Sequence, residues 1–457
     1  MIIYQDFLEA HDKQAFILGA IQSFKNSEGY RRAIKAQSYY QGNNTTINER
    51  LRWFIDSTGA KQRDKFRANN RISSEFFPKI VKQMVSYLTA NGLTTDDEIK
   101  NAIGGRKFDV QLQNAGEYAS VDGVAWGYCF IDDKGRFRTV MWRGTEVIPM
   151  YDERTGAVSG AIRFWQLENR PMYVTLYELE GYTEYKFNKG KGEQLTEKTP
   201  YKLVVNQDIL GEEVVNGSNF SKLPLFPLFI NSIHQSAFTK ALESQIDLYD
   251  IITSDFGDNL EDNKDIVWLL KNYQGQDIGE FLSDLKEYGV IKTDSDGGAE
   301  AHQQEVPYNA RQVALELLKK QIYEGSMSLD TSVLSGGSLT NVAIKANMQD
   351  LDLKTDDFEN QLIDFVDNII QLYLEHINQS NKEYKIEFIR RSLINDSEIV
   401  ENIYKMRNDI SHKTALKLNP YIEDVDLELD NLDEEAIANV TLSEPIDFDT
   451  EETEELL

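Results

Sequence analysis

The chain has 457 residues and a formal net charge of −28 at pH 7, and 41% of its residues are hydrophobic, which is enough to bury the cores of several domains. Its one cysteine, Cys129, excludes a disulfide framework and a multi-cysteine zinc site within one chain. The acidic charge argues against tight wrapping of nucleic acid, which needs clustered Lys and Arg, and the longest apolar run, at 223–230, is too short for the roughly 20 residues of a membrane helix.

The first hundred residues have the spacing of helices. Ile17, Ile21 and Phe24 would share one helical face, and Asn91-Gly92 is typical of the end of a later helix. This part also concentrates basic charge beside aromatic residues, a combination that suits either nucleic acid or a protein interface. The acidity of the rest of the chain favours charge-complementary self-assembly. The basic patch consists of Arg31, Arg32, Lys35, Arg50, Arg52, Lys61, Arg63, Lys65, Arg67 and Arg71, with Tyr39, Tyr40 and Trp53.

Residues 105–125 predict one more helix, after which the pattern changes to strands. From 124 to 210, aromatic and β-branched residues are dense, and turn residues such as those at 132–135 separate the runs. We expect about eight short antiparallel strands in this region, with residues 223–230 leading out of it. The fold class is therefore α+β and mainly helical.

Residues 237–263 predict a helix with an acidic polar face, because no Lys or Arg occurs between Lys240 and Lys264. A small α/β insert is expected at 265–306, with strands at 266–270, 290–292 and 303–306 and a helix at 278–288. Another helix is expected to begin near Pro307.

Residues 326–341 form an almost uncharged stretch rich in Ser, Gly and Leu, which predicts a flexible loop suited to a moving contact. Apolar residues then recur with alternating spacings of four and three from Ile344 to Leu372, which predicts one long amphipathic helix. A strand at 384–391 and helices at 397–407 and 411–418 follow. After Asn419 there are fifteen acidic residues and no Lys or Arg, so we expect the end of the chain to be disordered.

The search for catalytic chemistry gives little. None of the five histidines pairs with another at zinc-binding spacing, and the chain has neither a Walker A sequence nor a Gly-x-Ser-x-Gly elbow. We therefore expect no catalytic residue, metal or cofactor. One acidic cluster on the predicted long helix suits either a two-metal nuclease site or, as we favour, the solvated face of a helix. Its members are Asp350, Asp352, Asp356, Asp357 and Glu359.

Several short sequences occur in an order typical of one protein family. They are Tyr39-Tyr40-Gln41-Gly42 with Ile47-Asn48-Glu49-Arg50, Asn69-Asn70-Arg71-Ile72 with Ile80-Val81, Glu146–Asp152 with Ala161–Trp165, Leu223-Pro224-Leu225, Ser335–Lys345, and Ile410–Leu416 with Asn419–Asp424. With the order of helical, β-rich and insert parts, these sequences resemble the portal proteins of tailed bacteriophages, specifically of long-tailed phages of Gram-positive hosts. The resemblance covers about residues 30–435.

The resemblance implies a structural, non-enzymatic protein that forms a twelve-subunit ring at one capsid vertex, through which double-stranded DNA is packaged and ejected. It also implies partners: terminase, a head–tail adaptor, and the major capsid and scaffold proteins, with no membrane partner. The protein would be in the virion, and in the host cytoplasm before assembly. The implied parts are a wing at 1–235, stem helices at 236–264 and 307–325, a clip at 265–306, a tunnel loop at 326–341, a long wing and channel helix at 342–379, a crown at 380–435 and an acidic tail at 436–457.

The implied contacts with DNA lie in the tunnel loop and the first turn of the long helix. They involve Ser335, Gly336, Gly337, Ser338, Leu339, Thr340, Asn341 and Lys345. An acidic channel wall that repels phosphate would be formed by Asp247, Asp250, Asp255 and Asp258. The alternatives are a metal-dependent nuclease that uses the acidic residues of the long helix, and another virion structural protein such as a minor head protein.

Overall fold

The computed structural model describes residues 2–56, 58–65, 67–132, 134–207, 213–262, 267–271, 298–302, 308–332, 341–391, 396–407, 409–419, 421–422 and 425–432. The chain divides into two compact units. The first contains Met1–Asp330 and Gln349–Arg391, and the second contains Thr331–Met348 and Ser392–Leu457.

Helices dominate the N-terminal part of the first unit, as predicted. Asp12 and Ser27 cap two of them by accepting hydrogen bonds from the backbone N–H groups of Ala15 and Tyr30. The helices are α1 (Tyr4–Glu9), α2 (Lys13–Asn26), α3 (Glu28–Tyr40), α4 (Thr45–Asn48), α5 (Phe76–Thr89), α6 (Asp97–Ile103) and α7 (Arg106–Asp122). The prediction missed a hairpin between α4 and α5, formed by β2 (Trp53–Ile55) and β3 (Lys61–Arg63). All six strand residues are exposed, so they lack the apolar–polar alternation that marks a strand.

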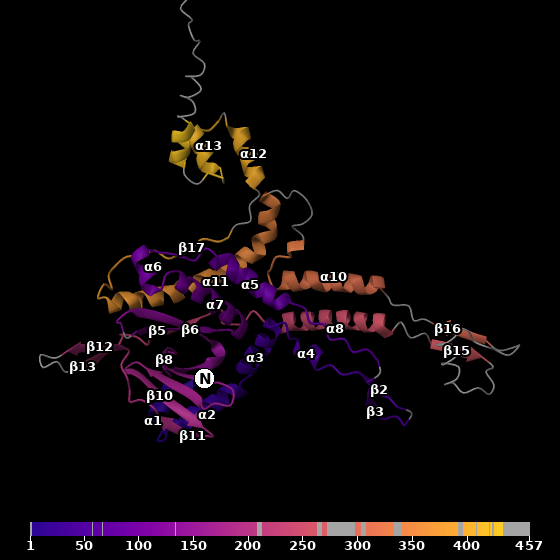
Figure 1. Ribbon diagram of the computed structural model, residues 1–457, viewed down its shortest axis with the longest axis horizontal. Coiled ribbons are helices and arrows are strands. Elements are labelled where there is room, and N and C mark those ends of the chain that lie inside the picture. The colour runs from indigo at the N-terminus through magenta and orange to yellow at the C-terminus, as the bar shows by residue number, and fades with distance from the viewer. Residues whose placement is uncertain are drawn as a thin grey trace, which may run out of the picture. The chain divides into compact units, whose positions relative to one another are not determined.

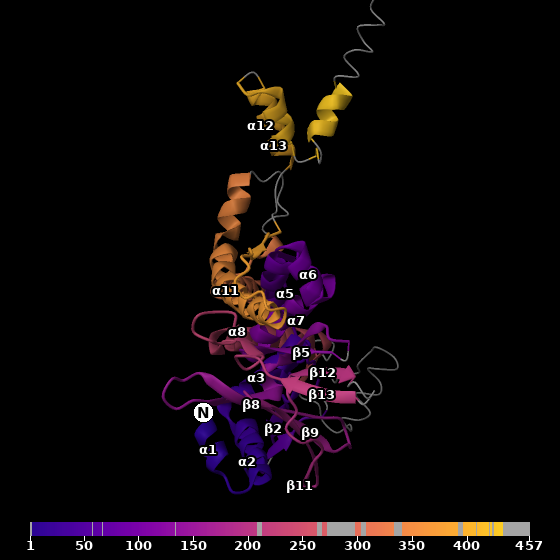
Figure 2. The same ribbon diagram turned by 90° about the vertical axis from the view of Figure 1, so that its left-hand side faces the viewer.

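The predicted β region forms two main sheets. The larger contains β1 (Ile2–Ile3), β7 (Val147–Tyr151), β8 (Val158–Gln166), β9 (Met172–Glu178), β10 (Gly181–Asn188) and β11 (Lys191–Gln194), in that order. Its pairs are antiparallel except that of β1 with β7. Helices α1 and α2 cover one face of this sheet (Figure 2), with Phe7, Ile17 and Ile21 buried against Ile148 and Ile162.

The smaller sheet has the order β14 (Leu225–Leu228), β5 (Ala125–Ile131), β6 (Phe137–Arg143). The run at 223–230, predicted only to lead out of the β region, thus returns to it as an edge strand. Pro227 is tolerated there, because an edge strand needs hydrogen bonds on one side only. A separate hairpin pairs β12 (Lys202–Gln207) with β13 (Glu213–Ser218).

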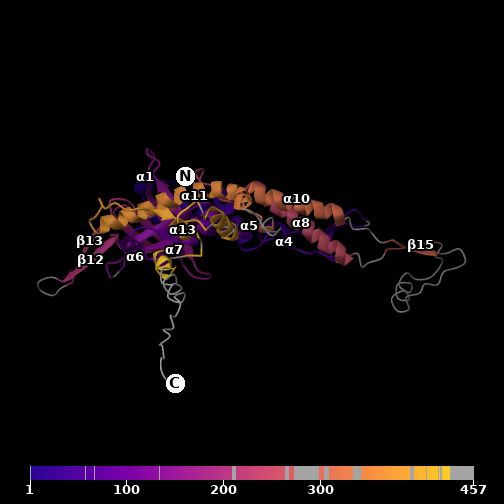
Figure 3. The same cartoon turned by 90° about the horizontal axis from the view of Figure 1, so that it is seen from above.

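Two long helices, α8 (Lys240–Asp262) and α10 (Tyr308–Gly325), lie side by side (Figures 1 and 3). Between them, β15 (Val267–Lys271) pairs antiparallel with β16 (Gly298–His302). The strand expected at 266–270 is therefore confirmed, and β16 lies just before the one expected at 303–306. The helix expected at 278–288 and the strands expected at 290–292 and 303–306 lie outside the described residues.

The predicted long helix is confirmed as α11 (Asn341–His376), which contributes residues 341–348 to the second unit. Thr355, Phe358, Leu362 and Phe365 are all buried, as the alternating spacing predicts. The strand expected at 384–391 shortens to β17 (Glu387–Phe388), because its partner β4 (Leu93–Thr94) has only two residues.

The second unit also contains α12 (Asp396–Met406) and α13 (His412–Leu418), close to their predicted ranges. Ser411 caps α13 by accepting a hydrogen bond from the backbone N–H of Thr414 at 3.2 Å. The end of the acidic tail, 433–457, lies outside the described residues. No helix within the described ranges combines the length and the apolar character that crossing a membrane requires.

Candidate functional site

Six of the eight residues predicted to touch DNA, 335–340, lie outside the described part of the chain. Of the others, Asn341 is the first residue of α11 and Lys345 lies exposed one turn later. The structure describes residues 326–332 of the predicted loop at 326–341. We call the first five of them, residues 326–330, the loop root.

The loop root is bonded to α5 through its backbone. The Gln83 side-chain amide donates from Nε2 to the Leu329 carbonyl at 3.1 Å, and its Oε1 accepts from the Leu329 N–H at 3.0 Å. The Leu329 side chain is buried at the same place. A paired amide contact of this kind satisfies both polar groups of a buried backbone position, so it holds the chain in one orientation.

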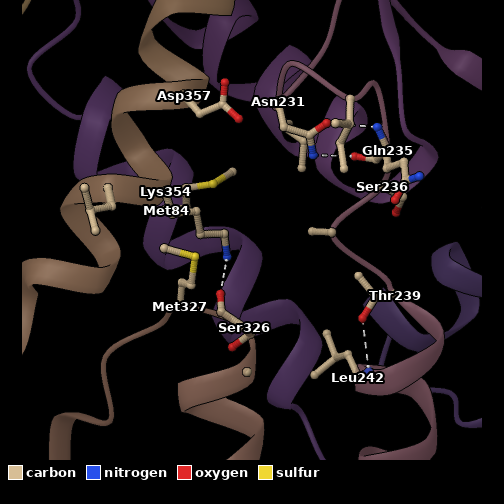
Figure 4. A pocket seen from close by; sticks show the side chains of 15 residues that line it. Met84, Asn231, Gln235, Ser236, Thr239, Leu242, Ser326, Met327, Lys354 and Asp357 are labelled. Atoms are coloured by element: carbon tan, nitrogen blue, oxygen red, sulfur yellow. Dashed lines mark hydrogen bonds between the residues drawn. The ribbon is translucent and has the colours of Figure 1, made fainter.

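Two lysines add contacts from α10 and α11. Lys319 lies 2.8 Å from the Asp330 carboxylate, whose hydrogen bond raises the pKa of the lysine. Lys354 donates from Nζ to the Ser326 carbonyl at 2.8 Å, and burial lowers the pKa of Lys354 to about 8. Figure 4 shows Lys354 reaching from α11 to Ser326 at the end of α10. Three elements therefore fix the loop root.

The chain reverses direction within the loop root. The Ser328 N–H donates to the Tyr323 carbonyl at 2.9 Å, and Met327 has a φ of 51°, a left-handed conformation of the kind that ends many helices. The stretch predicted to be flexible from residue 326 thus starts with a fixed segment. Gln83 is 246 residues from Leu329 in the sequence, so local composition gave no signal of it.

A pocket of about 360 Å³ lies beside the loop root (Figure 4). Its wall is largely apolar, and its polar groups include Lys354 and Asp357. Asp357 is itself occupied, because it accepts a hydrogen bond from the Ser232 N–H at 3.2 Å. Within the described residues, no group of three or more His, Cys, Asp or Glu side chains is arranged to hold a metal ion. Lys354 is likewise bonded to Ser326, so the pocket offers mainly an apolar surface.

The four acidic residues predicted to form a channel wall face residues 39–74 of the same chain. Asp247 accepts from the Tyr39 hydroxyl at 2.6 Å, and Asp250 accepts from the Asn44 amide at 2.8 Å. Asp255 pairs with Arg50 at 2.9 Å, and Asp258 with Arg52 at 2.7 Å.

These contacts correct the prediction of an acidic channel wall for two of its four residues. Asp250 and Asp258 are buried, so they cannot face phosphate across a channel. Burial also raises the pKa of Asp250, against the opposing effect of its hydrogen bonds. The exposed residues Ala241, Ser244 and Leu248, near the start of α8, are instead uncharged. An acidic helix face looks the same in a sequence whether water or a polar segment covers it.

The acidic cluster on α11 surrounds an arginine. Arg390 forms ion pairs with Asp352, Asp356 and Glu359, and the Tyr87 hydroxyl donates to Asp352 at 2.6 Å. A guanidinium among these carboxylates supplies the positive charge that a two-metal site would need from its ions. The geometry therefore supports a structural role for this cluster.

The predicted basic patch is divided by the fold. Tyr39 is buried, the Tyr40 hydroxyl donates to Glu117 at 2.7 Å, and Arg50 and Arg52 pair with α8. Several other members remain exposed on or next to the β2–β3 hairpin. They are Trp53, Lys61, Arg63, Lys65 and Arg67.

Comparison with known proteins gives one consistent result. A family model described as phage portal protein, SPP1 Gp6-like, matches residues 25–441. The portal protein of Bacillus phage SPP1 is 26% identical over 432 residues, covering 88% of this chain and 83% of that protein. The portal protein of Clostridium phage phiCD119 is 27% identical over 440 residues, covering 90% of this chain and 94% of that protein.

Proposed function

Because the chain belongs to the SPP1 Gp6-like family of phage portal proteins, we propose that it forms a ring at one capsid vertex and that double-stranded DNA passes through the ring during packaging and ejection. The observation that carries the proposal is the extent of the match, which runs from residue 25 to residue 441 and spans most of both relatives. The same proposal includes a ring of twelve subunits, on which a terminase docks first and a head–tail adaptor docks later.

We assign the parts of such a ring to elements of the chain. Helices α8 and α10 form the stem, residues 265–306 the clip, and residues 326–341 the tunnel loop. Helix α11 links wing and channel, and residues 380–435 form the crown. The antiparallel packing of α8 against α10 supports the stem assignment. The ring of Phe256, near the end of α8, lies 6.0 Å from the ring of Tyr308, the first residue of α10.

Within the proposed channel, contacts with DNA fall to residues 335–341 and Lys345. The loop root supports a specific form of this contact. Gln83, Lys319 and Lys354 hold residues 326–330, so the tunnel loop is attached to the fold at a fixed place. A fixed loop root would keep the residues that contact DNA at the same place on the subunit.

The proposed repulsion of phosphate falls to carboxylates other than Asp250 and Asp258. Asp255 keeps a third of its side-chain surface exposed although it pairs with Arg50 and Arg52. The exposed residues Ala241, Ser244 and Leu248 carry no charge, so they would slide past DNA without an ionic contact. In this form the channel wall is uncharged at these three residues, and its acidic groups, such as Asp255 and Glu261, lie toward the end of the helix.

Electron microscopy and mass photometry of the purified protein, with and without a scaffold protein, test the proposal. We expect closed rings with a central hole and a mass of about twelve chains (52.4 kDa each). A protein that stays monomeric under both conditions and cleaves plasmid DNA with Mg²⁺, losing that activity on Asp352→Asn, would contradict it and support a nuclease.

A further inference from the structure

The β2–β3 hairpin exposes a cluster of large apolar side chains. Trp53 is 50% exposed, Phe54 42% and Ile55 74%. The two strands form a sheet of their own (Figure 1). A two-stranded hairpin with no core on either face is only marginally stable in water, and clustered exposed apolar groups mark interaction surfaces.

The hairpin is nevertheless built with a defined shape. The Asp56 carboxylate at its turn accepts from the Thr58 hydroxyl at 2.5 Å, the Ala60 N–H at 3.0 Å and the Gln62 amide at 2.9 Å. These bonds lower the pKa of Asp56 to about 2, and the bond from Thr58 has the largest effect. The carboxylate therefore remains ionised at neutral pH.

The base of the hairpin is tied to the fold. The Asp64 N–H donates to the Arg52 carbonyl at 2.9 Å, and the Arg52 side chain pairs with the buried Asp258 of α8. An exposed apolar surface that is held in shape at both ends is prepared for contact before a partner arrives, which lowers the entropy cost of binding.

The composition of the hairpin points to an acidic protein partner. The Lys61 ammonium lies 5.1 Å from the centre of the Trp53 ring, and Arg63, Lys65 and Arg67 are exposed nearby. Aromatic residues and arginine are enriched at the centres of protein interfaces. A second copy of this chain, with its net charge of −28, supplies the complementary charge.

Helix α10 offers a matching surface on that second copy. Val313 and Leu317 lie one turn apart and are 64% and 55% exposed. Glu316, next to Leu317, adds an exposed carboxylate to this surface, whereas Glu324 is paired with the exposed Lys320 at 3.5 Å. In a ring, each subunit presents one patch to the neighbour on one side and a different patch to the neighbour on the other. We propose, on the basis of the ring proposed above, that the β2–β3 hairpin of one subunit docks on α10 of the next.

Cross-linking between two variants that each add one exposed cysteine tests this contact. The native Cys129 is buried, and burial raises the pKa of its thiol well above the usual range, so it gives little background reaction. Phe54→Cys and Leu317→Cys proteins, mixed before ring assembly and treated with a short bismaleimide, should give a dimer band that neither protein gives alone. A variant that combines both substitutions should give a ladder of higher oligomers.

Leu167→Cys, at a residue that is 70% exposed but lies outside α10, serves as the matched partner control and should give at least tenfold less dimer with Phe54→Cys. Rings that are visible by microscopy but give no more dimer with Leu317→Cys than with the control overturn the hairpin contact and leave the portal function standing. If the wild-type chain forms no ring under any condition, both proposals fail.

A charge-reversal variant separates this proposal from one in which the hairpin binds nucleic acid. Lys61→Glu combined with Arg63→Glu should reduce the ring fraction at least fivefold at equal protein concentration, with an unchanged circular dichroism spectrum because both residues are exposed. Normal rings that lose retention of double-stranded DNA would assign the hairpin to nucleic acid and overturn the contact between subunits.

Discussion

Asp122, at the end of α7, is a carboxylate that the fold buries without fully satisfying. Its Oδ1 accepts from the Gln37 amide at 2.9 Å and from Arg143 at 3.2 Å. Its Oδ2 is buried with no hydrogen-bond partner among the described residues. Burial raises the pKa of Asp122 to about 6, although Arg143 and Gln37 act in the opposite direction.

This pKa predicts a specific dependence of stability on pH. Between about pH 4 and pH 6, Asp122 is protonated in the folded chain but ionised in the unfolded chain. It therefore contributes stability that is fully present below its ordinary pKa and is lost as the pH rises through about 6. Asp122→Asn removes that contribution. The wild-type protein should therefore gain about 1 kcal/mol relative to the variant between pH 7 and pH 5, measured by urea unfolding at both values. Parallel pH profiles of the two proteins would contradict the assignment.

At the scale of elements, α11 contributes a row of fully buried side chains to the first unit. Glycines on neighbouring elements make room for its aromatic side chains. An added Cβ at Gly127 of β5 would overlap the Phe365 ring, and one at Gly116 of α7 would lie 3.0 Å from the Phe358 ring. Both rings are buried almost completely, so the helix can approach the sheet only where a side chain is absent.

Gly127→Ala should therefore destabilise the protein by about 1–3 kcal/mol through overpacking. Gly19→Ala is the control, because Gly19 lies in α2 with nothing within 4 Å of an added Cβ, and alanine favours a helix by about 0.5–1 kcal/mol over glycine. Thermal unfolding should show a lower Tm for the first variant and an unchanged or higher Tm for the second. Equal Tm values for Gly127→Ala and wild type would mean that Phe365 can move aside.

The sequence predicted those elements whose burial repeats along the chain. The spacing of Leu351, Thr355 and Phe358 made α11 predictable, because one face of a long helix is buried at each turn. The β2–β3 hairpin was missed, because exposure on both faces leaves no pattern. Contacts between distant segments, such as Gln83 with Leu329, also leave no local signal, and the acidic face of α8 was assigned to a channel wall because its partners lie about 200 residues away.

At the scale of the whole molecule, the stretch at 326–341, which we propose as the tunnel loop, contains the point where the chain passes from one unit to the other. The first unit is interrupted after Asp330 and resumes at Gln349, and the residues between them belong to the second unit. The loop root therefore marks the point at which the chain leaves the first unit.

Deleting residues 335–338 should leave the rings intact, because the loop root and both flanking helices keep their contacts. Packaging of DNA into proheads should fall at least tenfold, measured as nuclease-protected DNA. Deletion of residues 436–439, in the acidic tail, is a control of the same length. Unchanged packaging would show that the loop tip is dispensable for moving DNA.

The Gln83 contact has a consequence for how this protein tolerates sequence change. Gln83 binds the Leu329 N–H and carbonyl, groups that every residue except proline carries alike. The position of the loop root therefore does not depend on which side chains follow Asp330. Substitutions in the segment after Asp330 can change its chemistry while the Gln83–Leu329 bonds keep the start of that segment unchanged.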